Sequence, residues 1–139
     1  MNYKIIGKYI KDLNFSIPNP KIFFLISKNI SNYKINIDIK SNQIKQNIIE
    51  VLTSLTLSPS TNDFEKINTK IVFATIVELS NENIDKKEIE SIVLIKVPSQ
   101  IYGELRKIFI NLFENSGFKD IKINKKIDFQ KLYKMRKVQ

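Results

Sequence analysis

The residue types that most catalytic sites depend on are scarce in this sequence. It contains no histidine and no cysteine, which removes the commonest general base and the usual ligands of a zinc site. Closely spaced carboxylates, such as Glu88 and Glu90 or Asp85 and Glu88, could do acid–base chemistry, but they also suit the first turn of an exposed helix. The glycines stand far apart, so no phosphate-binding loop is evident. We therefore expect a protein that is not an enzyme, with no cofactor and no metal site.

Basic residues are the second chemical signal. The formal net charge is +9, and residues 119–139 hold seven lysines and one arginine against two aspartates. Lysines interleaved with aromatic residues are typical of single-stranded nucleic-acid binding, through phosphate contacts and base stacking. Alternatively, Phe129 and Tyr133, four residues apart, anchor a terminal helix whose lysines face water. No ribonucleoprotein aromatic motif is present, and we do not expect a specific nucleic-acid partner. The residues of this basic stretch are Lys119, Lys122, Lys125, Lys126, Phe129, Lys131 and Tyr133.

Four segments have mainly apolar residues at every second position, and the first two alternate these with polar residues, as strands with one buried face do. They are residues 13–17, 33–40, 49–57 and 71–79. Pro18 and Pro20 end the first segment, because proline cannot donate a backbone hydrogen bond to a neighbouring strand. Residues 58–66 have the composition of a hairpin loop. The pattern predicts an antiparallel meander sheet with one face exposed to solvent.

The period of the apolar residues changes after the last of these segments. Asp85 is a suitable N-cap for a short helix that we expect Pro98 to end, and Ser99 is a suitable cap for a second helix. This main helix is predicted near residues 99–115, followed by Gly117 in the left-handed conformation. Strands followed by helices predict an α+β fold, with a four-stranded antiparallel sheet and helices packed on one face, in a single domain over residues 1–139. The apolar face of the main helix contains Ile101, Leu105, Ile108, Phe109, Leu112 and Phe113.

The predicted sheet has more apolar surface than one long helix can cover. An uncovered apolar surface marks a site for a partner, which would be another subunit, an extended client chain, or both. No apolar run approaches the ~18 residues of a membrane helix, so we expect no membrane insertion. Residues 1–11 show no secretory signal, and the lack of cysteine is compatible with a reducing compartment. We expect a cytoplasmic protein.

Three motifs, in order along nearly the whole chain, resemble the SecB family of protein-export chaperones. Residues 9–20 (YIKDLNFSIPNP) are similar to the family's opening motif Tyr-x-Lys-Asp-x-Ser-Phe-Glu-x-Pro-x-x-Pro, and Phe23 follows at the expected place. Residues 97–102 (VPSQIY), followed by Arg106, resemble the family's Cys-Pro-Ser/Asn-x-Leu-Phe and its arginine. Residues 116–118 (SGF) and 127–133 (IDFQKLY) resemble its Gly-x-Phe and its Val/Ile-Asp/Asn-Phe-x-x-Leu-Tyr motifs.

The resemblance implies both a fold and a function. The fold would be a four-stranded antiparallel sheet flanked by helices, assembled as a homotetramer that is a dimer of dimers. The function would be that of an ATP-independent holdase, which binds unfolded preproteins and delivers them to the SecA translocase for export. By motif position, the client-binding groove would contain Phe23, Ile35, Ile37 and Tyr133. The surface that faces SecA would contain Asp12, Ile76 and Glu78.

Departures from the family pattern keep two further functions open. Asn14 and Ser16 replace the usual serine and glutamate, and the chain is basic where family members are generally acidic. One alternative is a SecB-like chaperone without SecA coupling, serving for example an unstable antitoxin. The other is a basic nucleic-acid-binding protein on the same scaffold.

Overall fold

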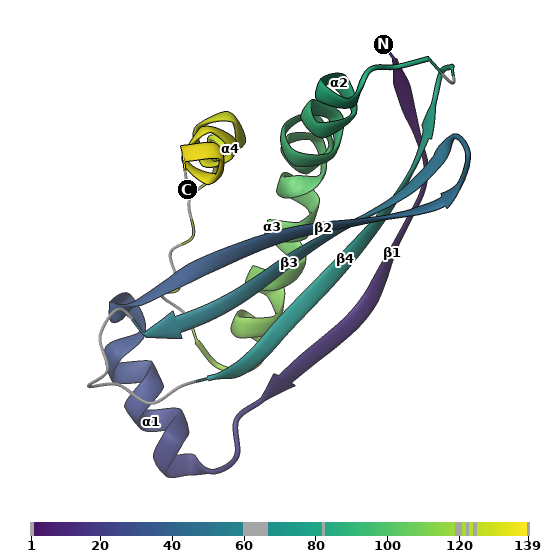
Figure 1. The fold of residues 1–139 in the computed structure, drawn as a ribbon. Helices are drawn as coiled ribbons and strands as arrows, with labels where there is room; N and C mark the ends of the chain where they lie inside the picture. Colours follow the sequence, from purple (N-terminus) through teal and green to yellow (C-terminus); the bar gives the residue numbers. More distant parts are fainter. Residues whose placement is uncertain are drawn as a thin grey trace.

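The computed structural model describes residues 2–59, 67–81, 83–118, 121, 123 and 125–138. Its sheet has four antiparallel strands, which are β1 (Tyr3–Ser16), β2 (Tyr33–Lys45), β3 (Ile48–Pro59) and β4 (Asn68–Leu79). The helical elements are α1 (Pro20–Asn29), the 3-10 turn η1 (Ile30–Asn32), α2 (Lys86–Ser91), the π-helical segment η2 (Ile92–Lys96), α3 (Val97–Asn115) and α4 (Phe129–Val138). α2, η2 and α3 lie along one face of the sheet, and α4 packs on η2 (Figure 1). The predicted four-stranded antiparallel sheet with helices is confirmed, while most of the predicted loop at 58–66 lies outside the described residues.

The strands are ordered β1-β4-β3-β2 across the sheet. β2, β3 and β4 follow one another as the predicted meander, but β1 pairs with β4 and not with β2, so the meander prediction is wrong for the first strand. The connection from β1 to β2 contains α1, which begins at Pro20 behind the N-cap Asn19. The Asn19 Oδ1 accepts a hydrogen bond from the Ile22 N–H at 2.9 Å. A hairpin would have kept β1 beside β2, whereas this longer connection carries the chain to the opposite edge of the sheet.

β1 is much longer than the strand predicted from residues 13–17. It pairs with β4 over its whole length, and its register shifts twice, between Ile5 and Gly7 and between Ile10 and Asp12. Each bulge adds a residue to one strand and moves the following side chains to the opposite faces. The first ten residues of β1 therefore lack the even alternation by which the other strands were recognised.

The core lies between the inner faces of β3 and β4 and the helical layer. Alternate side chains of these two strands are buried against the predicted apolar face of α3. On this face Ile108 and Leu112 are partly buried at the margin. The fully buried residues of α3 that confirm the predicted stripe are Ile101, Leu105, Phe109 and Phe113. Their strand partners include Leu55 and Leu57 of β3 and Ile71 and Phe73 of β4.

α2, η2 and α3 follow one another without a break, so the expected separation into two helices at Pro98 is wrong (Figure 1). Proline has no N–H and interrupts the regular helical hydrogen bonds. Here the π-turn of η2 precedes it, and the Val97 N–H bonds to the Ile92 carbonyl five residues back. Ser99 does not cap a new helix, because its Oγ donates to the Ile95 carbonyl at 2.6 Å. A single widened turn has thus accommodated the proline inside one long helical rod.

Both ends of this rod follow the sequence signals. The Asp85 Oδ1 accepts a hydrogen bond from the Glu88 N–H at 2.8 Å, so the predicted N-cap is confirmed. At the other end Gly117 has a φ of 94°, the left-handed region that glycine adopts without steric strain. The Phe118 N–H then bonds to the Phe113 carbonyl at 3.0 Å, as in a Schellman motif.

Candidate functional site

A groove runs along β2, between this strand and the helices. It consists of three adjoining hollows of about 590, 290 and 460 Å³. The first and second hollows share Ile37 and Leu132, and the second and third share Ile39 and Leu94, so they follow one another along the strand. We call this feature the β2 groove. Its lining is residues 33–42 of β2 with Ile89, Glu90, Val93, Leu94, Tyr102, Ile123, Ile127, Leu132 and Tyr133.

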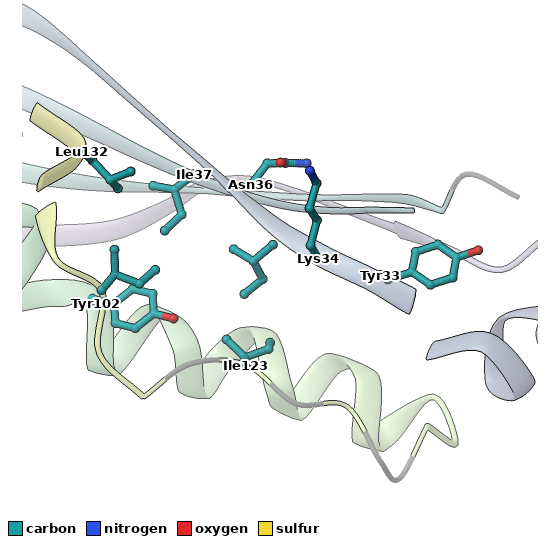
Figure 2. Close-up of a pocket in the computed structure, with 9 residues that line it drawn as sticks. Tyr33, Lys34, Asn36, Ile37, Tyr102, Ile123 and Leu132 are labelled. Atoms are coloured by element: carbon teal, nitrogen blue, oxygen red, sulfur yellow. The ribbon is translucent and has the colours of Figure 1, made fainter. Parts of the chain in front are cut away.

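β2 gives the groove an apolar inner side and a polar outer side. Its isoleucines at positions 35, 37 and 39 pack against the core clusters, while the intervening polar residues at 34, 36, 38 and 40 are exposed. Figure 2 shows Ile37 on the side of the strand that faces Tyr102 and Ile123, with Lys34 and Asn36 on the other side. The strand thus presents apolar side chains to the helices and polar side chains to water.

The opposite wall is built on α3 and on the segment that follows it. Tyr102 is almost fully buried, and this burial raises the pKa of its phenol, with a smaller opposing effect from the Arg106 charge. Arg106 also donates from Nε and Nη2 to the Ile123 carbonyl, at 3.1 and 3.0 Å. This charged, two-donor contact holds the segment against α3. The wall is therefore formed before any ligand arrives.

α4 covers the middle of the groove, and two side-chain contacts hold it in place. Phe129 is only 2% exposed, and its ring lies 6.0 Å from that of Tyr102 in an edge-to-face arrangement. One turn further on, the Tyr133 hydroxyl donates to the Glu90 Oε2 at 2.6 Å. These contacts confirm that Phe129 and Tyr133 anchor a terminal helix. They also place Leu132 and Tyr133 in the lining of the groove.

Other kinds of site have little support in the described part of the chain. Its residues contain no group of three acidic side chains that could hold a metal ion. Nor does any described helix have the length and apolar character needed to cross a membrane. Phe129 is buried and cannot stack on a nucleic-acid base, while Lys125, Lys126 and Lys131 face solvent. Lys119 and Lys122, which belong to the same predicted basic stretch, lie outside the described residues.

The residues expected to face SecA lie on the same outer face of the sheet, opposite the helices. Asp12 is the cross-strand partner of Val72, and directly paired residues point to the same side of a sheet. Val72, Ile76 and Glu78 alternate along β4 with the residues buried under the helices. Glu78 forms an ion pair with Lys4, its partner on β1, at 3.3 Å. The structure thus places these residues on one surface, and their role toward SecA stays a prediction.

Glu50 is a carboxylate that is buried on this same outer face, and the sequence reasoning did not identify it. It is 7% exposed, accepts a hydrogen bond from the Tyr9 hydroxyl, and lies 3.3 Å from the Lys11 Nζ. The Tyr9 side chain reaches it across β4, where the small Ala74 is the cross-strand partner of Tyr9. The hydrogen bond from Tyr9, followed by the contact with Lys11, lowers the pKa of Glu50 despite its burial, and the same bond raises the pKa of Tyr9. This cluster joins β1 to β3 across the outer face.

A profile of the family described as preprotein translocase subunit SecB matches residues 1–139. The chain belongs to the SecB family. A protein named as SecB in Pelagibacter ubique (strain HTCC1062) is 44% identical over 135 residues, which cover 97% of this chain and 96% of that protein. The protein-export protein SecB of Rhodospirillum rubrum is 26% identical, over 95% of this chain and 80% of its own. SecB-family proteins are chaperones of protein export and not enzymes.

A solved structure with the same fold comes from Mycobacterium tuberculosis. It is a SecB-like chaperone in complex with a ChAD peptide from the HigA1 antitoxin. The two folds superpose with a TM-score of 0.64 and 12% sequence identity, covering 88% of this chain and 86% of that one. At this identity the similarity establishes the SecB-like fold and no more.

Three of the four residues expected to bind clients in this SecB-family chain line the β2 groove. They are Ile35, Ile37 and Tyr133. Phe23 is not among the lining residues, because its ring packs on Phe118 at 5.0 Å and lies beside Gly117, at the end of α3. Whether Phe23 takes part in client binding stays a prediction.

Most of the wall opposite β2 was missed by the sequence reasoning. The helix pattern places Tyr102 beside an apolar stripe without showing what it faces, and Leu132 adjoins the predicted Tyr133. Ile123 and Ile127 lie in a segment with no regular period. The only sequence signal for these positions is that the second and third family motifs contain Tyr102, Ile127 and Leu132.

Proposed function

We propose that this protein is an ATP-independent holdase, acting as a single domain, that binds unfolded preproteins in the β2 groove and delivers them to SecA. The observation that carries the proposal is the β2 groove itself. It is open to solvent, extends over much of a long strand, and has apolar walls from β2, η2, α3 and α4. An extended chain can lie in such a groove, whereas a compact small ligand would occupy only part of it.

The residues of the groove explain binding without sequence specificity. Isoleucine and leucine side chains gain about 25 cal/mol for each Å² of apolar surface that a client removes from water. They impose no hydrogen-bond pattern, so many different apolar segments satisfy them. The aromatic residues Tyr102 and Tyr133 add apolar area with few rotatable bonds. No step requires nucleotide or a chemical reaction.

Delivery to SecA is supported by the family assignment and by the outer face of the sheet. Relatives of this chain are named as protein-export proteins. Asp12, Ile76 and Glu78 share one surface, away from the groove, so a client and SecA could be bound together. A complex that uses both surfaces at once would let SecA take over a client before it is released.

A second candidate is a SecB-like chaperone that does not couple to SecA. Ser16 stands where the family has glutamate, and the outer-face carboxylates Glu50 and Glu78 are paired with lysines. The Mycobacterium tuberculosis protein of the same fold is bound to an antitoxin peptide. On this proposal the groove keeps its role and only the destination of the client differs.

The protein is proposed to form a homotetramer, as a dimer of dimers. Support comes from apolar side chains that one chain leaves in water. Phe24 of α1 is 68% exposed, and β1 at the edge of the sheet exposes further large apolar residues. Large apolar side chains exposed along one edge of a sheet and on a neighbouring helix are candidates for an interaction site. The exposed residues concerned are Ile6, Tyr9, Ile10 and Leu13 of β1 with Phe24 and Leu25 of α1.

We place the protein in the cytoplasm, where preproteins are synthesised and where SecA would receive them. The lack of cysteine suits a reducing compartment. A holdase for export substrates must meet its clients before they cross the membrane, so this location follows from the proposed activity.

The test is the suppression of aggregation of a chemically unfolded preprotein, without nucleotide, between 50 and 200 mM salt. Apolar binding should change little over this range. Binding dominated by lysine contacts to a polyanion would weaken by ~10³ or more if about six phosphates were involved. Single-stranded nucleic acid is therefore titrated in parallel. Tighter binding of nucleic acid than of unfolded polypeptide at physiological salt would overturn the proposal.

Matched substitutions locate the binding surface. Ile37→Asp places a charge in the apolar wall and should weaken client binding at least about tenfold. Thr56→Asp adds the same charge on the outer face of β3, opposite Lys70, and should leave client binding unchanged. Pull-down of SecA in the presence of a preprotein, with Glu78→Lys as the variant, separates the export holdase from the chaperone without SecA coupling.

A further inference from the structure

α4 is attached to the rest of the molecule by one narrow face. Phe129 is buried and Tyr133 is partly buried, while the other described side chains of this ten-residue helix are exposed. The two anchoring residues contact the Tyr102 ring and the Glu90 carboxylate. Figure 1 shows α4 as the outermost helix on its side of the fold. Most of its surface is therefore turned to solvent.

The exposed side of α4 combines lysines with large apolar side chains. Leu132 is 42% exposed and Met135 is 54% exposed, and Lys131 and Lys134 are exposed beside them. Residues three and four apart are neighbours on the surface of a helix. Lys131 therefore adjoins Lys134 and Met135, and Met135 adjoins Leu132. We call these four residues the α4 surface, an apolar pair bordered by two ammonium groups.

The charge of this region is one-sided. Residues 125–137 contain six basic residues and one acidic residue, Asp128, whose Oδ1 accepts a hydrogen bond from the Lys131 N–H at 3.0 Å. An exposed helix gains stability when each lysine has a glutamate one turn away, but the sequence of α4 contains no acidic residue. The region is therefore a concentrated positive charge. Its basic residues are Lys125, Lys126, Lys131, Lys134, Arg136 and Lys137.

We propose that α4 docks on the surface of an anionic lipid bilayer. The apolar side chains of a docked helix enter the boundary between head groups and acyl chains by ~5–10 Å, and lysine stems reach back to the lipid phosphates. Leu132 and Met135 take the first position, and Lys131 and Lys134 the second. The ten residues of α4 are about half of the ~20 that a membrane span needs, so the helix lies on the bilayer and does not cross it. This interaction goes beyond the holdase function and does not depend on it.

The make-up of the α4 surface favours lipid over other polyanions. Proteins bind single-stranded nucleic acid with aromatic side chains that stack on the bases, whereas Phe129 is buried and Tyr133 is turned toward Glu90. The carboxylates of an acidic protein are matched best by the planar fork of arginine, whereas five of the six basic residues here are lysines. A bilayer interface accepts diffuse positive charge together with exposed apolar side chains such as Met135.

Docking through α4 brings the β2 groove to the membrane. α4 contributes Leu132 and Tyr133 to the lining of the groove. The lipid surface and the groove are therefore separated by about one helix diameter, ~10 Å. A docked protein holds the contents of its groove close to the bilayer. Because Leu132 borders both surfaces, occupation of the groove and docking on lipid act on the same helix.

The first test measures cosedimentation of the full chain, without client, with vesicles of phosphatidylglycerol and phosphatidylcholine. The salt concentration is ~0.1 M, at which exposed charges act over about 10 Å. Binding should rise with the phosphatidylglycerol fraction and be absent on pure phosphatidylcholine. Lys131→Gln combined with Lys134→Gln should weaken binding at least about tenfold, since each charge near such a surface contributes about fivefold.

The matched control removes the same charge from the sheet. Lys45 and Lys70 are exposed on β2 and β4, and Lys45→Gln combined with Lys70→Gln should change vesicle binding less than about threefold. An equal loss in the two double variants would overturn the proposal, because net charge and not α4 would then decide the binding.

The second test uses tryptophan as a reporter, because the chain contains none. Met135→Trp and Ile44→Trp place one indole at positions of equal exposure, 54%, on α4 and on β2. Tryptophan prefers the interface of a bilayer, so the emission of Met135→Trp should shift to the blue on anionic vesicles, and this variant should bind more tightly than the parent protein. Ile44→Trp should keep the spectrum that it has in buffer. An unshifted Met135→Trp, or an equal shift at both positions, would overturn docking through α4.

Soluble polyanions test the choice of partner. Polyglutamate, single-stranded nucleic acid and inorganic phosphate are added as competitors to the same vesicles. None of them should displace the bound protein as well as an equal charge of fresh phosphatidylglycerol vesicles does. If polyglutamate or nucleic acid binds the parent protein more tightly than the vesicles do, lipid is not the partner and the proposal falls.

Suppression of aggregation, measured without vesicles, separates this proposal from the holdase function. Lys131 and Lys134 are exposed and are not among the residues that line the groove. The double variant at these two positions should therefore suppress aggregation as the parent protein does. Vesicle binding by a parent protein that fails to suppress aggregation would overturn the holdase function and leave lipid docking standing. Normal suppression by a parent protein that leaves anionic vesicles unbound would overturn lipid docking alone.

Discussion

The two edge strands of the sheet, β1 and β2, differ in regularity and in where they place their apolar side chains. β1 has two bulges in its pairing with β4, whereas β2 keeps one register with β3 as far as Gln43. β1 exposes large apolar side chains, for example Ile10 and Leu13, directly to solvent. β2 turns its isoleucines at positions 35, 37 and 39 toward the helices, where they are partly or fully buried.

The difference suits the two edges to different partners. A bulged edge twists locally and cannot offer a long, evenly spaced row of backbone groups to an arbitrary strand. Its exposed side chains instead define a shaped surface, which suits a partner with one fixed structure. A regular edge beside an apolar wall suits partners that differ in sequence and share only an extended backbone. On this view subunit contacts belong to β1 and client contacts to β2.

The largest effect that would separate the two edges is expected from Phe129→Ala. Truncating a buried phenylalanine lowers the free energy of unfolding by about 3–5 kcal/mol. Here the substitution removes the packing that holds α4 over the β2 groove. We expect the amides of α4 to lose protection in hydrogen exchange and client affinity to fall, while light scattering shows an unchanged mass. Phe24→Ala on the exposed surface of α1 is the matched control, since it should leave α4 and client affinity intact. Detachment of α4 with no change in client affinity would show that α4 is not part of the site.

The next effect tests the β1 edge. Leu13→Asp places a charge on the surface proposed for subunit association, and should raise the subunit dissociation constant at least about tenfold. Ile44→Asp makes a comparable change at an exposed position of β2 and should leave the mass unchanged. Light scattering over a dilution series measures both. An unaltered mass for Leu13→Asp, or a monomeric parent protein at micromolar concentration, would contradict the assignment of subunit contacts to β1.

The regularity of β2, β3 and β4 also explains which strands the sequence predicts. In these strands every second residue points to the helices and is mostly apolar, and in β2 the intervening residues are polar and exposed, so a period of two can be recognised. In β1 the bulges between Ile5 and Gly7 and between Ile10 and Asp12 shift the alternation, and a pattern of period two cannot follow it. α1 was not predicted at all, because Pro20 was interpreted as a strand terminator when it is the first residue of a helix.

The groove shows a second limit of sequence reasoning. Ile35, Ile37 and Tyr133 could be placed in it only through the family motifs, and the structure puts all three in its lining. The opposite wall depends on how α3 and α4 pack on β2. This packing is a tertiary contact, and no periodic pattern within a single segment of the sequence indicates it. Pro98 misled the helix prediction because a π-turn two residues earlier is invisible in the residue types.

A smaller effect is expected from Tyr133→Phe, which removes the hydrogen bond between α4 and Glu90. A hydrogen bond of this kind contributes about 1 kcal/mol net, so α4 should open more often and client affinity should fall about two- to fivefold. The β1 edge should be unaffected. Glu90→Gln keeps an acceptor for the Tyr133 hydroxyl and should have the weaker effect of the two. Equal loss in both variants would indicate that the Glu90 charge acts on the client directly.

The smallest effect concerns Glu50, whose cluster attaches β1 to the rest of the sheet on the outer face. The contacts with Tyr9 and Lys11 lower the pKa of Glu50 below its ordinary value of 4.5. A carboxyl group with a lowered pKa in the folded state stabilises the fold above the unfolded-state value, and this stabilisation is lost as the pH falls below about 4.5. Glu50→Gln should therefore lower the free energy of unfolding by about 1 kcal/mol at pH 7. It should also make the loss of stability between pH 7 and pH 3.5 smaller than in the parent protein.

Urea unfolding at the two pH values measures this difference, and Tyr9→Phe provides the partner control. Without the Tyr9 hydroxyl, Glu50 loses the main cause of its lowered pKa but keeps the contact with Lys11, so this variant should show a reduced pH dependence that lies between those of the parent protein and Glu50→Gln. If Glu50 fastens the bulged strand, both substitutions should increase hydrogen exchange in β1 and leave β2 unchanged. An equal increase at both edges would mean that the cluster stabilises the whole sheet, and that the two edges are not independent.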